Sequence, residues 1–293
     1  MQANIGVRAA LIVGILLLVA APTVAATPNG SATNRAARDE ALRAIPLARL
    51  AASDRARVSK VLVDSSIFRR LPTQVIDCDP EFYLYLVEHP ELVVEVWRVL
   101  GISTVTLDRD ENETLHADDG AGTVGKVDLI YRSQEAHVFY ADGCYDGPVF
   151  NQPLKGQCVL LLRSSYVRKA DGTYSVTCRL DSFLHLDNAT LEVLAKVMQP
   201  LVGQIADHNF RETTLFVAAL HQAAQCNLAG LDDVISRMKD VRPEICQQFA
   251  ELSEQVAVEA AIAKTEALRA AARAQSGEGQ RTVRRPSAAV PQR

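Results

Sequence analysis

The stretch from Cys158 to Leu186, CVLLLRSSYVRKADGTYSVTCRLDSFLHL, decides the fold. Two runs of strand-like residues, 158–168 and 174–186, stand on either side of the dipeptide Asp171-Gly172. An Asp-Gly pair between two such runs is a strong short-range signal for a β-hairpin with a two-residue turn. The stretch therefore predicts two long antiparallel strands joined by a tight turn.

Outward from this hairpin, a period-two pattern reaches back to Ile102, with turn signals at regular intervals. We count six strands, at residues 103–107, 113–117, 126–132, 137–141, 158–168 and 174–186. A further short strand is expected at 71–77. After it, Asp79 can cap a helix that begins at Pro80, and the break at His89-Pro90 predicts two short consecutive helices.

Helices are also expected on both sides of this region. Before it, residues 41–62 predict a helix broken by Pro46. After it, a long helix should run from 189 to 224, with Pro200 on the face away from its apolar stripe. A second helical stretch is expected at 231–274, broken near Pro243, so that C-terminal helices fill residues 225–275. Residues 276–293 have the composition of a disordered basic tail.

The first 26 residues have the pattern of a signal peptide. Arg8 precedes the apolar run AALIVGILLLVAA, and Val24-Ala25-Ala26 offers small residues at the spacing of a cleavage site. The alternative is an uncleaved anchor, but the run stops at Pro22, short of the roughly 20 apolar residues that span a bilayer. We therefore expect an exported protein, periplasmic or extracellular, in which residues 27–67 form a flexible lead-in and the broken helix.

Composition excludes some classes of function. The chain has 293 residues, of which 48% are hydrophobic and 23% charged, so it can bury a sizeable core. Its formal net charge of -4 is too small and too evenly spread to indicate nucleic-acid binding. Six cysteines without a CxxC motif favour disulfides over a zinc site in an exported chain, with buried free thiols as the alternative.

The order of these elements indicates an α+β fold: a strand, two short helices, six antiparallel strands and one long helix. This order resembles the helix-grip fold of the START-like superfamily, which includes lipid-transfer domains and polyketide cyclases. The likeness covers residues 68–224 and is one of topology, not of motif. It implies a curved antiparallel sheet gripped by the long C-terminal helix, with extra helices at both ends and an enclosed space for a ligand. The chain also resembles uncharacterised secreted bacterial proteins, a likeness that supports export.

The resemblance also implies a pairing of the cysteines. The first and last strands would be neighbours, which would bring Cys78 near Cys178. Cys144 and Cys158 would lie at facing ends of consecutive strands, and a bridge between Cys226 and Cys246 would tie the C-terminal helices together.

A charged pair interrupts the apolar stripe of the long helix. The stripe consists of Leu194, Met198, Leu201 and Ile205, and His208 and Glu212 follow at the same helical spacing. Because they are four residues apart, the two can pair on one face. One interpretation is a structural pair, with the helix shifting its exposed face after Ile205. The other is that the pair lines a cavity, with Met198 and Ile205, and meets the polar end of an apolar ligand.

Three strand residues are further candidates for ligand binding. Alternation places Arg163 with Val159 and Leu161. If that face is concave, Arg163 points into the cavity and can hold a carboxylate or phosphate; if convex, it is solvated. Tyr131 and Tyr140 alternate with aliphatic residues and form one face of a probable hairpin, which is a core stripe, part of a ligand pocket, or both.

Support for metal binding or catalysis is weak. Asp108-x-Asp110-x-Asn112 begins like a calcium loop, but Glu113 occupies the position where the turn demands glycine. The sequence contains neither GxSxG nor HExxH, so we expect no metal, no cofactor and no catalytic residue.

The leading hypothesis is therefore an exported binding or carrier protein for an apolar small molecule or lipid. The alternatives are a START-like enzyme that uses His208 and Glu212 for acid-base chemistry, and an envelope scaffolding protein that docks a partner through residues 229–275.

Overall fold

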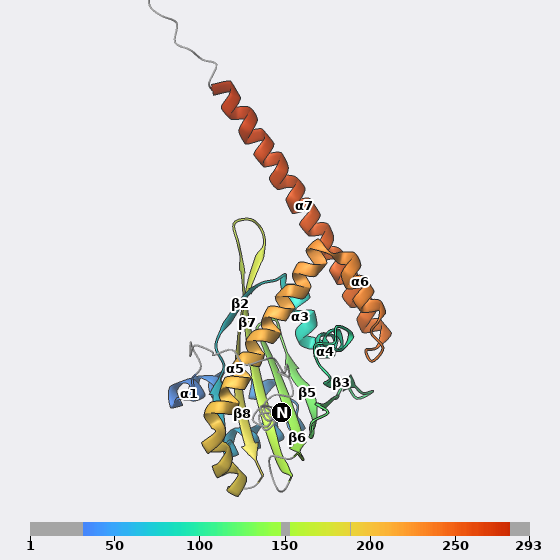
Figure 1. Cartoon of the computed structure of the whole chain (residues 1–293). Coiled ribbons are helices and arrows are strands. Elements are labelled where there is room, and N and C mark those ends of the chain that lie inside the picture. Colours follow the sequence, from blue (N-terminus) through green and yellow to red (C-terminus); the bar gives the residue numbers. More distant parts are fainter. Residues whose placement is uncertain (1–31, 148–152, 188, 282–293) are drawn as a thin grey trace, which may run out of the picture.

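The computed structural model describes residues 32–147, 153–187 and 189–281, and it leaves out the side chains of residues 189–202, 270–271 and 274–281. The expected signal peptide and the last part of the expected basic tail lie outside these residues. Within them, the chain folds into an α+β structure around one curved, unclosed antiparallel sheet of eight strands (Figure 1). None of the described helices is long and apolar enough to cross a membrane.

The sheet has the order β1-β8-β7-β6-β5-β4-β3, and β2 also pairs with β8. Its strands are β1 (Ile67–Arg70), β2 (Gln74–Asp77), β3 (Thr106–Arg109), β4 (Leu115–Asp118), β5 (Thr123–Arg132), β6 (Ala136–Tyr145), β7 (Leu154–Arg168) and β8 (Tyr174–Leu186). All six strands predicted in the middle of the chain are present. The first strands pair with the last, as a helix-grip arrangement requires.

The hairpin predicted around Asp171-Gly172 is confirmed, but its turn is longer than two residues. Lys169 and Thr173 close the hairpin, since the Lys169 amide donates to the Thr173 carbonyl over 2.8 Å. Gly172 has a φ of 86°, in the left-handed region that glycine adopts without strain. This is the three-residue loop in which the last residue must be left-handed.

Two layers of helices cover opposite faces of the sheet. We call the face that carries Val159 and Leu161 the α2 face, because α1 (Arg35–Ala44), η2 (Leu47–Arg49) and α2 (Ala52–Asp64) pack on it. We call the face that carries Cys158 and Leu160 the α5 face. It is covered by α3 (Pro80–Glu88), α4 (Pro90–Val99) and the second half of α5 (Ala189–Cys226).

Two local contacts set the position of α3 and α5. The Asp79 carboxylate caps α3 as predicted, because it accepts from the amides of Glu81 at 2.8 Å and Phe82 at 3.0 Å. His221 Nε2 on α5 accepts from the Asp79 amide over 3.2 Å. Burial lowers the pKa of His221, which keeps this nitrogen free to accept.

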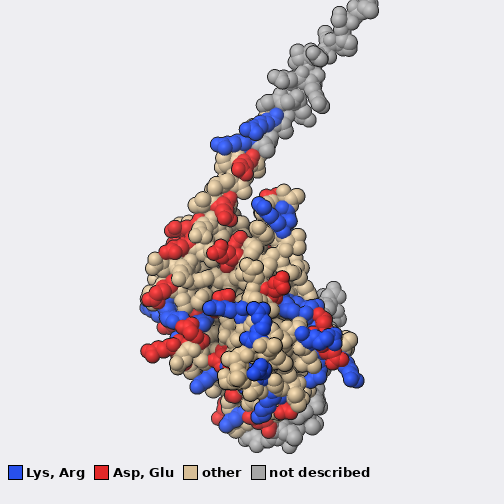
Figure 2. Space-filling view, turned by 180° about the vertical axis from the view of Figure 1, so that it is seen from behind, with Lys and Arg blue, Asp and Glu red and all other residues tan. Residues whose placement is uncertain are grey.

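The C-terminal helices differ from the prediction in where they end. α6 (Leu228–Ser236) and α7 (Pro243–Arg281) pack beside α5, and α7 continues into the segment that we expected to be a disordered tail. Figure 1 shows α7 leaving the body of the protein. On the face drawn in Figure 2, basic and acidic side chains are interspersed over the body.

Candidate functional site

The structure does not bring the predicted site residues together. Arg163 points to the α2 face, where its guanidinium donates to Glu40 of α1 at 3.0 Å and to Asp181 of β8 at 2.9 Å. Arg163 is therefore on the side of the sheet away from α5, where it is paired and half-buried, and its predicted role in holding a ligand stays a prediction. Strand alternation showed which residues share a face with Arg163 but not which helix covers that face.

Tyr131 and Tyr140 also belong to the α2 face. The guanidinium of Arg49 lies 5.1 Å from the Tyr131 ring centre, and that of Arg57 lies 4.3 Å from the Tyr140 ring centre. A β-bulge between Leu129 and Tyr131 changes the alternation, so that Leu129 packs on the α5 face and Tyr131 on the other. We predicted the face of the two tyrosines from strict alternation, which does not allow for this extra residue.

The predicted stripe of α5 is rotated from the one observed. The buried residues of the described half are Gly203, Ala206, Asn209, Phe210, Thr214, Val217, Leu220, His221 and Ala224. At about 100° per residue, Ile205 and Glu212 lie beside this stripe and His208 lies opposite its centre, and all three are only half-buried. Met198 lies in the part of α5 whose side chains are outside the described residues.

The rotation of α5 follows from its contact with β1. The Arg69 guanidinium lies against Gly203 and donates to both carboxylate oxygens of Asp207, with Nε at 2.9 Å from Oδ1. Only a residue without Cβ leaves this room at position 203. Gly203 therefore faces β1, and this contact decides which side chains of α5 point toward the core.

The predicted pair of His208 and Glu212 is loose. His208 Nδ1 and Glu212 Oε1 are 3.8 Å apart, and Arg211 binds both residues, at 3.2 Å from the imidazole nitrogen and 3.0 Å from the carboxylate. An arginine can only donate, so His208 Nδ1 accepts and the hydrogen of the neutral ring sits on Nε2. That Nε2 atom is buried, and no described residue forms a hydrogen bond with it.

Two further polar atoms on α5 lack partners. Asn209 is 4% exposed, and its Oδ1 has no hydrogen-bond partner among the residues that the structure describes; the same is true of the buried Oγ1 of Thr213. Asn209 and Thr213 are four residues apart and lie between Ala206, Phe210 and Val217 on the sheet side of α5. Leaving a buried polar group without a hydrogen bond lowers the stability by about 1–3 kcal/mol, so hydrogen-bond partners for these three atoms would stabilise the protein.

Asn209 and Thr213 were not among the predicted site residues. The spacing of Phe210, Val217, Leu220 and Ala224, followed back from the end of the helix, would have placed both on the buried face. The prediction instead extended the spacing of the first half of α5 across Pro200.

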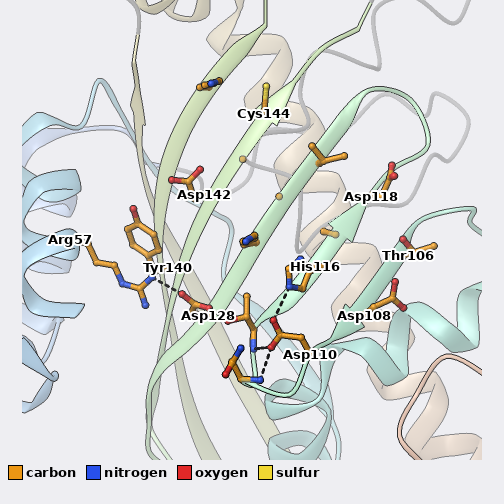
Figure 3. Close-up of a pocket in the computed structure, with 18 residues that line it drawn as sticks. Arg57, Thr106, Asp108, Asp110, His116, Asp118, Asp128, Tyr140, Asp142 and Cys144 are labelled. Atoms are coloured by element: carbon orange, nitrogen blue, oxygen red, sulfur yellow. Dashed lines mark hydrogen bonds and ion pairs between the residues drawn. The ribbon is translucent and has the colours of Figure 1, made fainter. Parts of the chain in front are cut away.

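A second candidate site is an open hollow of about 1050 Å³ on the α2 face, beyond the end of α2 (Figure 3). Its polar side chains lie in rows across the strands. One row consists of Asp108, His116, Lys126 and Asp142, which are successive partners in the ladders from β3 to β6. Neighbouring members of this row are about 5 Å apart, so the hollow presents acidic and basic side chains next to one another.

The inner groups of this hollow already satisfy one another. Asp128 accepts from Arg57 at 2.5 Å and from the Thr114 hydroxyl at 2.7 Å, and Asp110 binds His116 Nε2 at 2.9 Å. Burial and the nearby Asp240 carboxylate raise the pKa of Asp108. The arrangement suits a polar ligand or solvent, and none of these groups needs a ligand to complete it.

Nucleophilic catalysis finds no support in the hollow. Cys144 is the thiol that lines it, and Figure 3 shows this residue well separated from His116, on another strand. A nucleophile and its base have to lie within about 3 Å of one another.

The turn that begins like a calcium loop is closed by its own backbone. Asp110 Oδ1 accepts from the amides of Asn112 at 2.8 Å and Thr114 at 3.0 Å. Glu113 adopts a φ of 65°, the conformation for which glycine is preferred. Among the described residues, no group of three or more His, Cys, Asp or Glu side chains is arranged to hold a metal ion.

The three disulfides implied by the resemblance are not formed, since all six cysteines are free in this structure. In the β2–β8 ladder Cys178 lies opposite Gln74, four residues from Cys78. Cys158 lies opposite Ala141 and therefore, by alternation, on the other face from Cys144. Cys226 is exposed at the end of α5, while Cys246 is half-buried 4.0 Å from the Met238 sulfur.

Comparison with known proteins assigns no family. No family model and no curated protein matches the chain. One matching solved structure is an uncharacterised protein from Rhizobium leguminosarum, with 10% identity over 49% of this chain and 97% of that chain, and a TM-score of 0.22. A likeness of that size carries no argument. The class of this protein is therefore given by its own architecture, a curved antiparallel sheet with a C-terminal helix, which is compatible with helix-grip topology.

Proposed function

We propose that the protein is a non-enzymatic binding or carrier protein that holds a small, mainly apolar molecule between α5 and the sheet. The observation that carries this proposal is the set of unpartnered polar atoms on α5, above all Asn209 Oδ1. A bound molecule with a polar end would supply the hydrogen bonds that these atoms lack.

The polar atoms indicate the chemistry of the ligand. His208 Nε2 offers a hydrogen, Asn209 Oδ1 accepts one, and the Thr213 hydroxyl does either. A carboxylic acid or an alcohol matches this set. The surrounding core cluster is apolar and includes Phe139, Leu160 and Phe210, so the rest of the ligand would be a hydrophobe such as a lipid chain.

Binding is better supported than catalysis. A general base has to lie within about 3 Å of its partner, whereas His208 and Glu212 are 3.8 Å apart and Arg211 occupies both. The arrangement of helix and sheet supports membership of the START-like superfamily, in which ligand transfer and catalysis both occur. We propose the carrier role for this chain.

The test is the retention of a hydrophobe. Native mass spectrometry and solvent extraction of the purified protein should reveal a bound lipid-like molecule, and a fluorescent fatty acid should bind the emptied protein. Asn209→Leu should weaken that binding about tenfold without lowering the melting temperature, because it removes an unsatisfied group. Gln204→Leu, on the exposed side of the same helix, is the matched control. Absence of a bound hydrophobe together with equal binding by both variants would overturn the proposal.

Export belongs to the same proposal, because an envelope carrier has to leave the cytoplasm. It rests on the pattern of the first 26 residues. Sequencing the N-terminus of the protein from fractionated cells tests it: a chain that starts near Thr27 in the envelope or the medium supports export, and one that starts at Met1 in the cytoplasm refutes it.

A further inference from the structure

α7 projects from the body beyond residue 260, and its described side chains at 261–269 are exposed. Its first half is held by the body, since Ile245, Phe249, Leu252 and Val256 are buried against the neighbouring helices. Every residue from 261 to 269 is exposed, and Figure 1 shows the helix continuing away from the body. An isolated helix of this length is only marginally stable in water, even when rich in alanine.

The buried face of α7 continues into this projecting half. After Val256, alanines follow at positions 260, 263 and 267. At about 100° per residue these positions stay within about 40° of the face that packs on the body. We call Ala260, Ala263 and Ala267 the alanine seam. Small side chains in such a row allow a second helix to approach closely.

A groove runs along the base of the alanine seam. It has a volume of about 1030 Å³ and lies between α7, α5, β2 and the tip of the β7–β8 hairpin. Its apolar lining includes the exposed side chains of Val75, Leu215 and Ile262. Its acidic residues are Asp77, Asp79, Asp171, Glu259 and Glu266, against Arg168 and Lys169. Lys169 is already paired with Asp77 at 2.5 Å, so the groove has an excess of negative charge.

The opposite charge lies further along the same helix. Arg269 and Arg273 follow the groove residues, and the chain continues with Arg281. Figure 2 shows basic side chains on the projecting part of the chain and acidic ones below them, toward the body. Because α7 is one continuous helix with a rise of about 1.5 Å per residue, Glu259 and Arg273 stay about 20 Å apart and cannot meet within one molecule.

We infer that the occupant of this surface is α7 of a second copy of the chain, in antiparallel orientation. A two-fold axis near Glu266 brings the two alanine seams face to face and sends the basic end of each helix toward the acidic groove of the other. It also places Glu259 beside the partner subunit's Arg273, because the two positions are equally far from the axis on the same flank of the helix. The pairing extends the interface that already holds the first half of α7.

The axis has one unfavourable consequence. It brings the two Glu266 carboxylates near each other, and like charges at that separation repel. Glu266→Gln should therefore tighten the pair about threefold, a gain that a merely structural role of α7 would not produce.

The test is the mass of the full-length protein as a function of concentration, by analytical ultracentrifugation in a reducing buffer so that the exposed Cys226 cannot crosslink. Dimers should form at micromolar concentration. Ala263→Glu, in the seam, should weaken the dimer at least about tenfold, whereas Ala261→Glu, on the opposite side of the same turn, should leave it within about twofold. Both variants should keep the melting temperature, because residues 261 and 263 are exposed.

A charge exchange tests the orientation. Glu259→Arg and Arg273→Glu should each weaken the dimer, and the double variant should restore it. A protein that stays monomeric at high concentration overturns the inference, and so does a dimer that tolerates Ala263→Glu. A dimer that Ala263→Glu weakens but that is not restored by the exchange overturns the antiparallel pairing. Ligand retention is measured separately, so failure of the dimer leaves the carrier proposal standing.

Discussion

Arg70 of β1 and Asp181 of β8 form a two-point ion pair beneath α1, with Nε at 2.6 Å from Oδ1 and Nη2 at 3.2 Å from Oδ2. The Asp181 side chain is fully buried and also accepts from Arg163. Glu40 of α1 closes the cluster, because it accepts from Arg70 at 2.6 Å, Arg163 at 3.0 Å and Arg179 at 2.8 Å. The cluster fixes α1 to the sheet and gives Arg163 a structural role.

Asp181→Asn should destabilise the fold strongly. The change leaves Arg70 and Arg163 without a buried counter-charge, and breaking a buried pair in this way costs about 3–5 kcal/mol. Urea unfolding gives the loss directly. The control is Asp39→Asn, because Asp39 and its partner Arg35 are 45% and 95% exposed, and it should change stability by less than about 0.5 kcal/mol. A loss at Asp181 as small as that of the control would contradict the buried pair.

Glu40 should make the fold sensitive to acid. Hydrogen bonds from Arg70 and then Arg163 lower the pKa of Glu40 from 4.5 to about 2. A carboxyl whose pKa is lowered by folding stabilises the protein above its unfolded value and loses that contribution as the pH falls through the folded value. The contribution is therefore complete above 4.5 and disappears toward 2.

The measurement compares melting temperatures of the wild-type protein and Glu40→Gln. The wild type should be the more stable at about pH 6, and the difference should shrink by about pH 3. A difference that grows as the pH falls would contradict the assignment.

Local sequence signals predicted the helices and strands of this fold better than they predicted what each element packs against. The hairpin at Asp171-Gly172, the cap at Asp79 and the helix from Ala189 are all readable from neighbours in the sequence. β1 was missed, because Ile67–Arg70 is short and ends in two arginines. Those arginines are explained by partners distant in the sequence, Asp207 for Arg69 and Asp181 for Arg70, which no local pattern announces.

The surroundings of the candidate site residues also depend on contacts between residues that are distant in the sequence. Alternation showed that Arg163 shares a face with Leu161, but only the packing of α1 and α2 shows that this face lies away from α5. The bulge before Tyr131 and the rotation of α5 each moved predicted residues by one position. On a strand, a shift of one position is enough to move a predicted site residue out of the site, because the neighbouring side chain points to the opposite face.

The six thiols should differ widely in reactivity. Burial raises the pKa of Cys158 to about 11 and that of Cys178 to about 12, and it raises that of Cys78 further, so these three stay protonated and shielded. Cys226 is exposed. Brief treatment of the native protein with a maleimide should modify Cys226 first, and Cys158 and Cys178 only after unfolding, as read by peptide mass spectrometry. Modification of Cys178 in the native state as fast as Cys226 would show that β8 is not packed as described.

Gly203 should be the residue that lets α5 dock on β1. Alanine in place of a helical glycine normally stabilises by about 1 kcal/mol. Here its Cβ would collide with the Arg69 guanidinium, which Asp207 holds in place, so Gly203→Ala should instead cost about 1–2 kcal/mol. In an Arg69→Ala background the collision is gone, and the same change should stabilise by about 1 kcal/mol. The measurement is urea unfolding of the wild type, of Gly203→Ala, of Arg69→Ala and of the double variant. If Gly203→Ala stabilises both backgrounds equally, Arg69 does not lie against α5, and the rotation that places Asn209 toward the sheet loses its cause.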